Sequence, residues 1–138
     1  MKILVTGGAG YVGGTTSALL VQQGHQVTVV DNLCHAKRSG IPAGVEFVEA
    51  DIADRARMES IFREASAANN SFDGVLHFAA LIEAGESMKY PEVYFRNNTA
   101  STLALLESVL ACGPKRFVFS STAAVYGEPE FVPIPESA

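Results

Sequence analysis

Three glycines that follow a short apolar run constrain this chain more than any other feature. Residues 2–5 have the continuous apolar character of a strand buried on both faces, and Gly7, Gly10 and Gly13 come directly after them. This spacing predicts a strand, a tight turn and a helix N-terminus. Glycines let the main chain approach phosphate oxygens, and the free N–H groups of a first helical turn attract their charge. We therefore favour a dinucleotide-binding turn over glycines that only pack a helix against a strand.

Strands and helices alternate along the rest of the chain. Further strands are predicted at residues 26–30, 45–48, 73–78 and 115–120, and helices at 11–23, after Asp54, and from Pro91 to near Gly113. The expected apolar contacts are Val12, Leu19 and Leu20 in the first helix, Met58, Ile61, Phe62 and Ala65 in the second, and Leu103, Leu106 and Leu110 in the third. This alternation predicts an α/β fold with a doubly wound parallel, Rossmann-like sheet. In such folds ligands bind at the carboxyl ends of the strands, where the strand order reverses.

Composition narrows the classes of protein and partner. The chain has 138 residues, of which 48% are hydrophobic, enough for one domain with a core. Its net charge is -5 and no basic stripe occurs, which argues against nucleic-acid partners. No apolar run is long enough to span a bilayer, so no membrane association is expected. Cys34 and Cys112 lack metal-ligand spacing, and we interpret them as reduced thiols of a cytoplasmic protein without a metal site.

Asp31 ends the second predicted strand about 20 residues after the glycine turn, where an acidic residue binds ribose hydroxyls. A carboxylate there also repels a 2′-phosphate, because two like charges in contact cost roughly 4 kcal/mol at an intermediate dielectric. The sequence therefore favours NAD over NADP. Lys37 and Arg38 argue in the other direction, since basic residues in this loop could hold the phosphate.

Other strand ends leave alternatives open. Asp51 and Ile52 suit an adenine amino group and ring, and equally a loop acid beside a core isoleucine. The hydroxyls of residues 120–122 suit a substrate oxygen and a general base, and equally strand-end capping. His77, just inside a buried strand, is interpreted as a satisfied core residue without a catalytic role. Of the adjacent residues 97 and 98, one asparagine is expected to face the sheet and bond to main chain or cofactor, while its neighbour faces elsewhere.

Together these segments resemble the extended short-chain dehydrogenase/reductase family. The matching segments are residues 6–13, 31–34, 51–52, 77–80, 85–87, 97–98 and 120–127. Within the family the pattern is most similar to 4-epimerases of nucleotide sugars, and residues 31–34 and 85–88 are the narrower signals. The resemblance implies an NAD-dependent isomerase that interconverts UDP-glucose and UDP-galactose through a transient 4-keto sugar. It also implies a UDP-sugar substrate, with a homodimer as a candidate assembly.

The resemblance assigns roles to individual residues. The main chain of Tyr11 and Val12 would meet the pyrophosphate, and Thr122 would hydrogen-bond the sugar's 4-hydroxyl as the one catalytic group present. The residues implied to bind the cofactor are Gly7, Gly10, Tyr11, Val12, Asp31, Asn32, Leu33, Cys34, His35, Ala36, Asp51, Ile52, Phe78, Ala79, Ala80, Leu81 and Asn97. Residues 31–36 would surround the adenosine ribose, and residues 78–81 would line the path to the nicotinamide.

The family's catalytic Tyr-x-x-x-Lys pair is missing from these residues, because no tyrosine has a lysine four positions later. We therefore expect residues 1–138 to be an incomplete NAD-binding domain, without the sugar-nucleotide domain and inactive as an epimerase when alone. The loss of one proton-transfer group already costs about 10²–10⁴-fold in rate. The alternatives are another nucleotide-sugar enzyme, such as a dehydratase or decarboxylase, and a non-catalytic NAD-binding module. Ala123 argues against a dehydratase, which usually carries an acid at that position.

Overall fold

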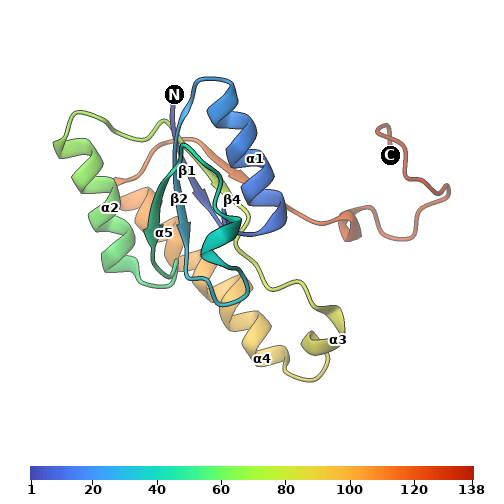
Figure 1. Cartoon of the computed structure of the whole chain (residues 1–138). Helices are drawn as coiled ribbons and strands as arrows, with labels where there is room; N and C mark the ends of the chain where they lie inside the picture. Colours follow the sequence, from blue (N-terminus) through green and yellow to red (C-terminus); the bar gives the residue numbers. More distant parts are fainter.

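Five parallel strands form a single sheet in the order β3-β2-β1-β4-β5 (Figure 1). The computed structural model describes all 138 residues. The strands are β1 Lys2–Thr6, β2 Gln26–Asp31, β3 Glu46–Glu49, β4 Gly74–His77 and β5 Phe117–Phe119. The chain builds outward from β1 to β3 and then returns to the other side of β1. The predicted doubly wound, Rossmann-like sheet is thus confirmed, and its order reverses between β1 and β4.

Helices cover both faces of this sheet. The three long helices are α1 Tyr11–Gln22, α2 Arg55–Ala67 and α5 Ser101–Cys112. The shorter elements are α3 Ala84–Ser87, α4 Pro91–Tyr94, a π-helical turn Phe95–Ala100, and 3₁₀ turns at Arg38–Gly40 and Ala123–Tyr126. Helix α1 lies on one face, and α2 and α5 pack together on the other (Figure 1). None of these helices is long and apolar enough to cross a membrane.

The alternation of side chains along β1 supplies two cores. Leu4 belongs to the core between the sheet and the α2–α5 pair, whereas Ile3 and Val5 face α1. All four apolar residues expected on α2 are buried in the first core: Met58, Ile61, Phe62 and Ala65. The sheet is therefore covered on both sides, which leaves the carboxyl ends of its strands as the natural place for a ligand.

Residues at the helix ends behave as their chemistry predicts. The carboxylate of Asp54 caps α2 by accepting a hydrogen bond from the amide of Arg57 at 3.0 Å. Gly24 follows α1 with φ +81, a left-handed conformation that favours glycine. Pro91 is the first residue of α4.

The predicted contacts of the first helix are wrong at two positions. Val12 and Leu19 are 55% and 53% exposed, and only Leu20 packs against the core. Helix α1 instead buries small residues, namely Gly13, Gly14 and Ser17. Small side chains let α1 approach the glycine turn, since a Cβ on Gly13 would lie 2.3 Å from the Gly7 oxygen.

The third helix also buries a different face from the one predicted. Leu103 and Leu110 are 57% and 86% exposed. The buried residues of α5 are Ser101, Leu105, Ser108 and Val109. Helix α5 carries apolar residues on several of its sides, so their spacing in the sequence did not define one buried face. The predicted continuous helix is also interrupted, because residues 95–100 form a π-helical turn between α4 and α5.

Candidate functional site

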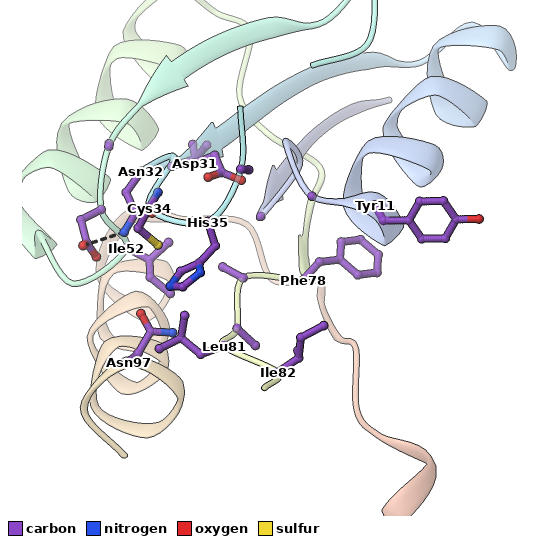
Figure 2. Close-up of a pocket in the computed structure, with 18 of the residues that line it drawn as sticks. Tyr11, Asp31, Asn32, Cys34, His35, Ile52, Phe78, Leu81, Ile82 and Asn97 are labelled. Atoms are coloured by element: carbon purple, nitrogen blue, oxygen red, sulfur yellow. Dashed lines mark hydrogen bonds between the residues drawn. The ribbon is translucent and has the colours of Figure 1, made fainter. Parts of the chain in front are cut away.

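The carboxyl ends of β1, β2, β3 and β4 open into a cavity of about 330 Å³ (Figure 2). It lies where the strand order reverses, as expected for a ligand site in this kind of sheet. Its lining residues are Gly7, Gly10, Tyr11, Val30, Asp31, Asn32, Cys34, His35, Ala36, Ala50, Asp51, Ile52, Phe78, Ala79, Ala80, Leu81, Ile82, Glu83, Tyr94 and Asn97.

The glycine turn forms the floor of this cavity. Gly7 has φ +72, and a Cβ there would lie 2.6 Å from the amide nitrogen of Ala79. Its own amide donates to the carbonyl of Val30 at 2.9 Å, which ties the turn to the end of β2. Only glycine fits between these two chains, so the turn is held close to both neighbouring strand ends.

The first turn of α1 presents unpaired amide groups. Gly10 is its N-cap and supplies no side-chain cap, and the N–H groups of Tyr11, Val12 and Gly13 have no acceptor in the protein. The Tyr11 side chain is 90% exposed and points away from the cavity, so Tyr11 offers its main chain there (Figure 2). Free amides and the helix dipole together make this turn suitable for an anionic group such as a phosphate.

Asp31 connects the glycine turn to the loop after β2. One carboxylate oxygen accepts from the Ala9 amide at 3.1 Å and the other from the Leu33 amide at 2.9 Å. Each oxygen can accept a second hydrogen bond, so the carboxylate is oriented and still able to receive ribose hydroxyls.

Asp51 lies beside Asn32 at the end of β3. The Asn32 amide donates to the Asp51 carboxylate at 3.0 Å, the bond drawn dashed in Figure 2. The other Asp51 oxygen accepts from the Ala53 amide at 2.8 Å. Ile52 is only 7% exposed and still contributes to the cavity wall. The acid is thus observed to cap its loop, and it also lines the cavity, while the adenine contact stays a prediction.

Two adjacent asparagines support the opposite wall. The Asn98 amide donates to the Leu81 carbonyl at 2.8 Å, and the Leu81 amide donates back to Asn98 Oδ1 at 2.9 Å. Asn97, which lines the cavity, donates to the same Oδ1 at 2.9 Å. The expectation that one asparagine faces elsewhere is wrong, since the side chains bond to each other beside the same loop.

The predicted residues and the cavity overlap closely. Every residue predicted to bind the cofactor lines the cavity except Val12 and Leu33. The analysis of the sequence missed Val30, Ala50, Ile82, Glu83 and Tyr94. Three of these adjoin predicted residues in the chain, Glu83 lies two positions after Leu81, and Tyr94 precedes Asn97 by one helical turn, so sequence position was the available signal.

Thr122 lies outside this cavity. Its hydroxyl accepts from the Ala124 amide at 3.2 Å and caps the 3₁₀ turn Ala123–Tyr126. Beyond β5 the chain runs away from the sheet (Figure 1). The capping interpretation is thus observed, and the catalytic role of Thr122 stays a prediction.

His77 is confirmed as a satisfied core residue. It is 2% exposed, with Nδ1 bonded to the Thr6 hydroxyl at 2.6 Å and Nε2 bonded to the Thr102 hydroxyl at 2.9 Å. Burial lowers the pKa of His77 to about 4, so the ring is neutral near pH 7. The neutral imidazole joins β1, β4 and α5 beneath the cavity.

No lysine or arginine lines the cavity. The Arg38 guanidinium pairs with Glu49 at 2.9 Å and lies 4.9 Å from the centre of the Phe47 ring. Lys37 is likewise absent from the wall, whereas Asp31 and Asp51 belong to it. The charge on the wall is therefore negative near the end of β2.

A parallel sheet that carries a glycine turn, unpaired helix amides and a strand-end acid at its reversal point defines a Rossmann-like nucleotide-binding domain. The profile of the NAD-dependent epimerase/dehydratase family matches residues 3–138, and the chain belongs to that family. The family resemblance inferred from the motifs is thereby confirmed.

Individual relatives are named UDP-glucose 4-epimerases. The Streptomyces lividans protein is 53% identical over 137 residues, which are 99% of this chain and 40% of the relative. The Klebsiella pneumoniae protein is 43% identical over 144 residues, which are 99% of this chain and 100% of that sequence. A crystal structure from Stenotrophomonas maltophila with bound NAD and formylated UDP-arabinopyranose has TM-score 0.87 and 43% identity, covering 100% of this chain and 42% of that chain. This chain thus spans about 40% of the first and third of these relatives.

Proposed function

We propose that this chain is the NAD-binding portion of an enzyme that interconverts UDP-glucose and UDP-galactose. One observation carries the proposal: the first turn of α1 has unpaired amides, and its residue Tyr11 lines a glycine-floored cavity beside an oriented carboxylate. The UDP-glucose 4-epimerase names of the relatives support the choice of substrate. A UDP-sugar is the proposed partner, and residues 1–138 are proposed to belong to the NAD-binding portion.

The cavity residues fit the parts of a dinucleotide. The amides of Tyr11 and Val12 would hold the pyrophosphate, and Asp31 would hold the adenosine ribose. Residues 78–81 and Asn97 would line the nicotinamide half. When bound, NAD supplies a reversible hydride acceptor, while this chain's residues bind it, orient it and keep it at the ends of the strands. Thr122 is proposed to hydrogen-bond the sugar's 4-hydroxyl.

The choice of NAD over NADP depends on charge. Asp31 repels a 2′-phosphate, and Arg38 is already paired with Glu49 outside the cavity. We therefore expect calorimetric titration to give tighter binding for NAD than for NADP. Tighter binding of NADP would contradict the ribose role of Asp31.

The glycine turn offers a direct test of the site. Gly10 has φ -78, which alanine adopts, and a Cβ there meets only the Gly7 oxygen, at 3.3 Å. Gly10→Ala should therefore fold while its methyl group obstructs the pyrophosphate, and NAD affinity should fall at least about tenfold. Gly85→Ala is the matched control, since open space surrounds its Cβ. Equal NAD affinities of the two variants and the wild type would refute this site.

Catalysis by the 138 residues alone is tested separately. Because they contain no Tyr-x-x-x-Lys pair, we expect NAD binding without turnover of UDP-galactose. A coupled assay for UDP-glucose formation is the measurement, and product above the protein-free blank would contradict the expectation. The homodimer and the cytoplasmic location stay predictions.

A further inference from the structure

Asn98 does not line the cavity, yet it holds the main chain of a residue that does. Its side-chain amide donates to the Leu81 carbonyl at 2.8 Å, and its Oδ1 accepts from the Leu81 amide at 2.9 Å. One side chain thereby pairs both polar groups of one main-chain residue, as a neighbouring strand would. Leu81 lies in the segment between β4 and α3, residues 78–83, and Ile82 and Glu83 after it also line the cavity. Phe78 still bonds to the Thr6 carbonyl of β1, but residues 81–83 have no main-chain bond to a strand, so the Asn98 pair takes that place.

The same oxygen of Asn98 also orients Asn97. Asn97 donates one amide hydrogen to Asn98 Oδ1 at 2.9 Å, while its Oδ1 has no partner in the protein. Asn97 lines the cavity, so its free oxygen and second amide hydrogen are available to a ligand. Both asparagines lie in the π-helical turn Phe95–Ala100, and such turns often occur at functional sites.

We propose that Asn98 is a positioning residue for the bound dinucleotide, acting through the Leu81 main chain and the Asn97 amide. The inference rests on the proposed function, because it assumes that NAD occupies the cavity. Asn98 itself need not touch the nucleotide. Its contribution is to hold one wall in the binding geometry before the ligand arrives, which lowers the ordering cost of binding.

The substitution Asn98→Asp gives a test that depends on protonation. A protonated carboxyl can donate to the Leu81 carbonyl and accept from the Leu81 amide, whereas a carboxylate has no hydrogen to donate and repels that carbonyl. We expect NAD affinity about tenfold below wild type at pH 8, recovering toward wild type as pH falls to 5. Calorimetric titration of wild type and variant at each pH measures this ratio.

Asn98→Ala is the matched control. It loses both bonds to Leu81 at every pH, so its affinity relative to wild type should stay low without recovery. The titratable groups near this wall are Glu83, Glu86, Tyr94 and His77. Both variants retain all four, so a recovery seen only in Asn98→Asp belongs to residue 98. Urea unfolding at the same pH values identifies any general loss of stability.

Hydrogen exchange provides a readout that needs no nucleotide. Without NAD, the Leu81 amide should exchange slowly in the wild type and at least about tenfold faster in Asn98→Ala. If the wild type binds NAD, either of two results would overturn this inference alone. One is a ratio of Asn98→Asp to wild-type NAD affinity that does not change with pH. The other is Leu81 amide exchange that is no faster in Asn98→Ala than in the wild type. A wild type that exchanges slowly at Leu81 and binds no NAD would overturn the proposed function and the positioning role that rests on it.

Discussion

Individual residues set the geometry of the cavity, either through a side chain or, in glycine, through the lack of one. Gly7 lies against the main chain just after β4, where any Cβ would meet the Ala79 amide at 2.6 Å. Asp31 is fixed by two amides before any ligand binds, one of them from the glycine turn. The floor and the Asp31 carboxylate are therefore organised together by contacts between individual residues.

Ser17 is a residue whose loss should stabilise the protein. Its hydroxyl is fully buried on α1 and has no hydrogen-bond partner. Ser17→Ala should raise the free energy of unfolding by about 1 kcal/mol, because it removes an unsatisfied polar group and improves helix propensity. Urea denaturation measures the change. The control is Ser108→Ala, which removes an equally buried hydroxyl that donates to the Ala104 carbonyl. This variant should therefore be the less stable of the two.

His77 should make stability depend on pH. The pKa of His77 is about 4 in the folded protein and 6.5 for an exposed ring, so the unfolded chain binds more protons between these values. The free energy of unfolding should therefore be fully retained above pH 7 and fall as pH drops from 6.5 toward 4. The loss between pH 7 and pH 5 should be about 1–2 kcal/mol.

Urea denaturation across that range is the measurement, with two variants for comparison. His77→Gln should flatten the pH dependence, since it removes the titrating ring. His35→Gln, on an exposed histidine, should preserve it. An equally steep loss of stability in His77→Gln would contradict the role given to burial.

At the scale of elements, packing decides which face of a helix is buried. Helix α5 is apolar on several sides, yet it presents two serines and two apolar residues to the interior. The π-helical turn before it orients Asn97 and Asn98 toward the same loop. The register of this helical run therefore determines both a core and a wall of the cavity.

Two leucines on α5 test this placement. Leu105 is fully buried and Leu103 is 57% exposed. Leu105→Ala should lower the free energy of unfolding by about 2–5 kcal/mol through lost burial and a cavity, whereas Leu103→Ala should change it by less than about 0.5 kcal/mol. Chemical denaturation of both variants gives the comparison, and similar losses at the two positions would contradict the observed face.

At the scale of the whole molecule, the site joins distant parts of the chain. Residues from Gly7 to Asn97 meet around one cavity, supplied by four strand ends and the helical run after β4. A ligand held by all of them opposes unfolding of the entire domain, because the unfolded chain has no such site.

NAD should therefore stabilise the folded chain in proportion to its occupancy. At 100 times its dissociation constant the gain in unfolding free energy should be about 2.7 kcal/mol. A thermal melt with and without NAD measures the shift, and the same NADP concentration should give a smaller one. Gly10→Ala should reduce the NAD shift, and a full shift in that variant would place the ligand elsewhere.

The sequence by itself determined the alternation of strands with helices, the glycine turn and the caps, and the family resemblance of its motifs indicated most of the residues around the cavity. These features depend on local chemistry, such as the conformational freedom of Gly7 or the capping oxygen of Asp54, and on the rule that ligands bind at strand ends. A short stretch of sequence is enough to identify each of these local features.

Only the tertiary structure decided which faces of α1 and α5 are buried, that Asn98 pairs with Leu81, and that Arg38 pairs with Glu49. Each of these features depends on how closely two segments that are distant in the sequence approach each other. In a helix with apolar residues on several sides, packing decides which face is buried. Val12 and Leu19 therefore lie exposed while small residues take the interior face of α1, because only small residues fit against the glycine turn.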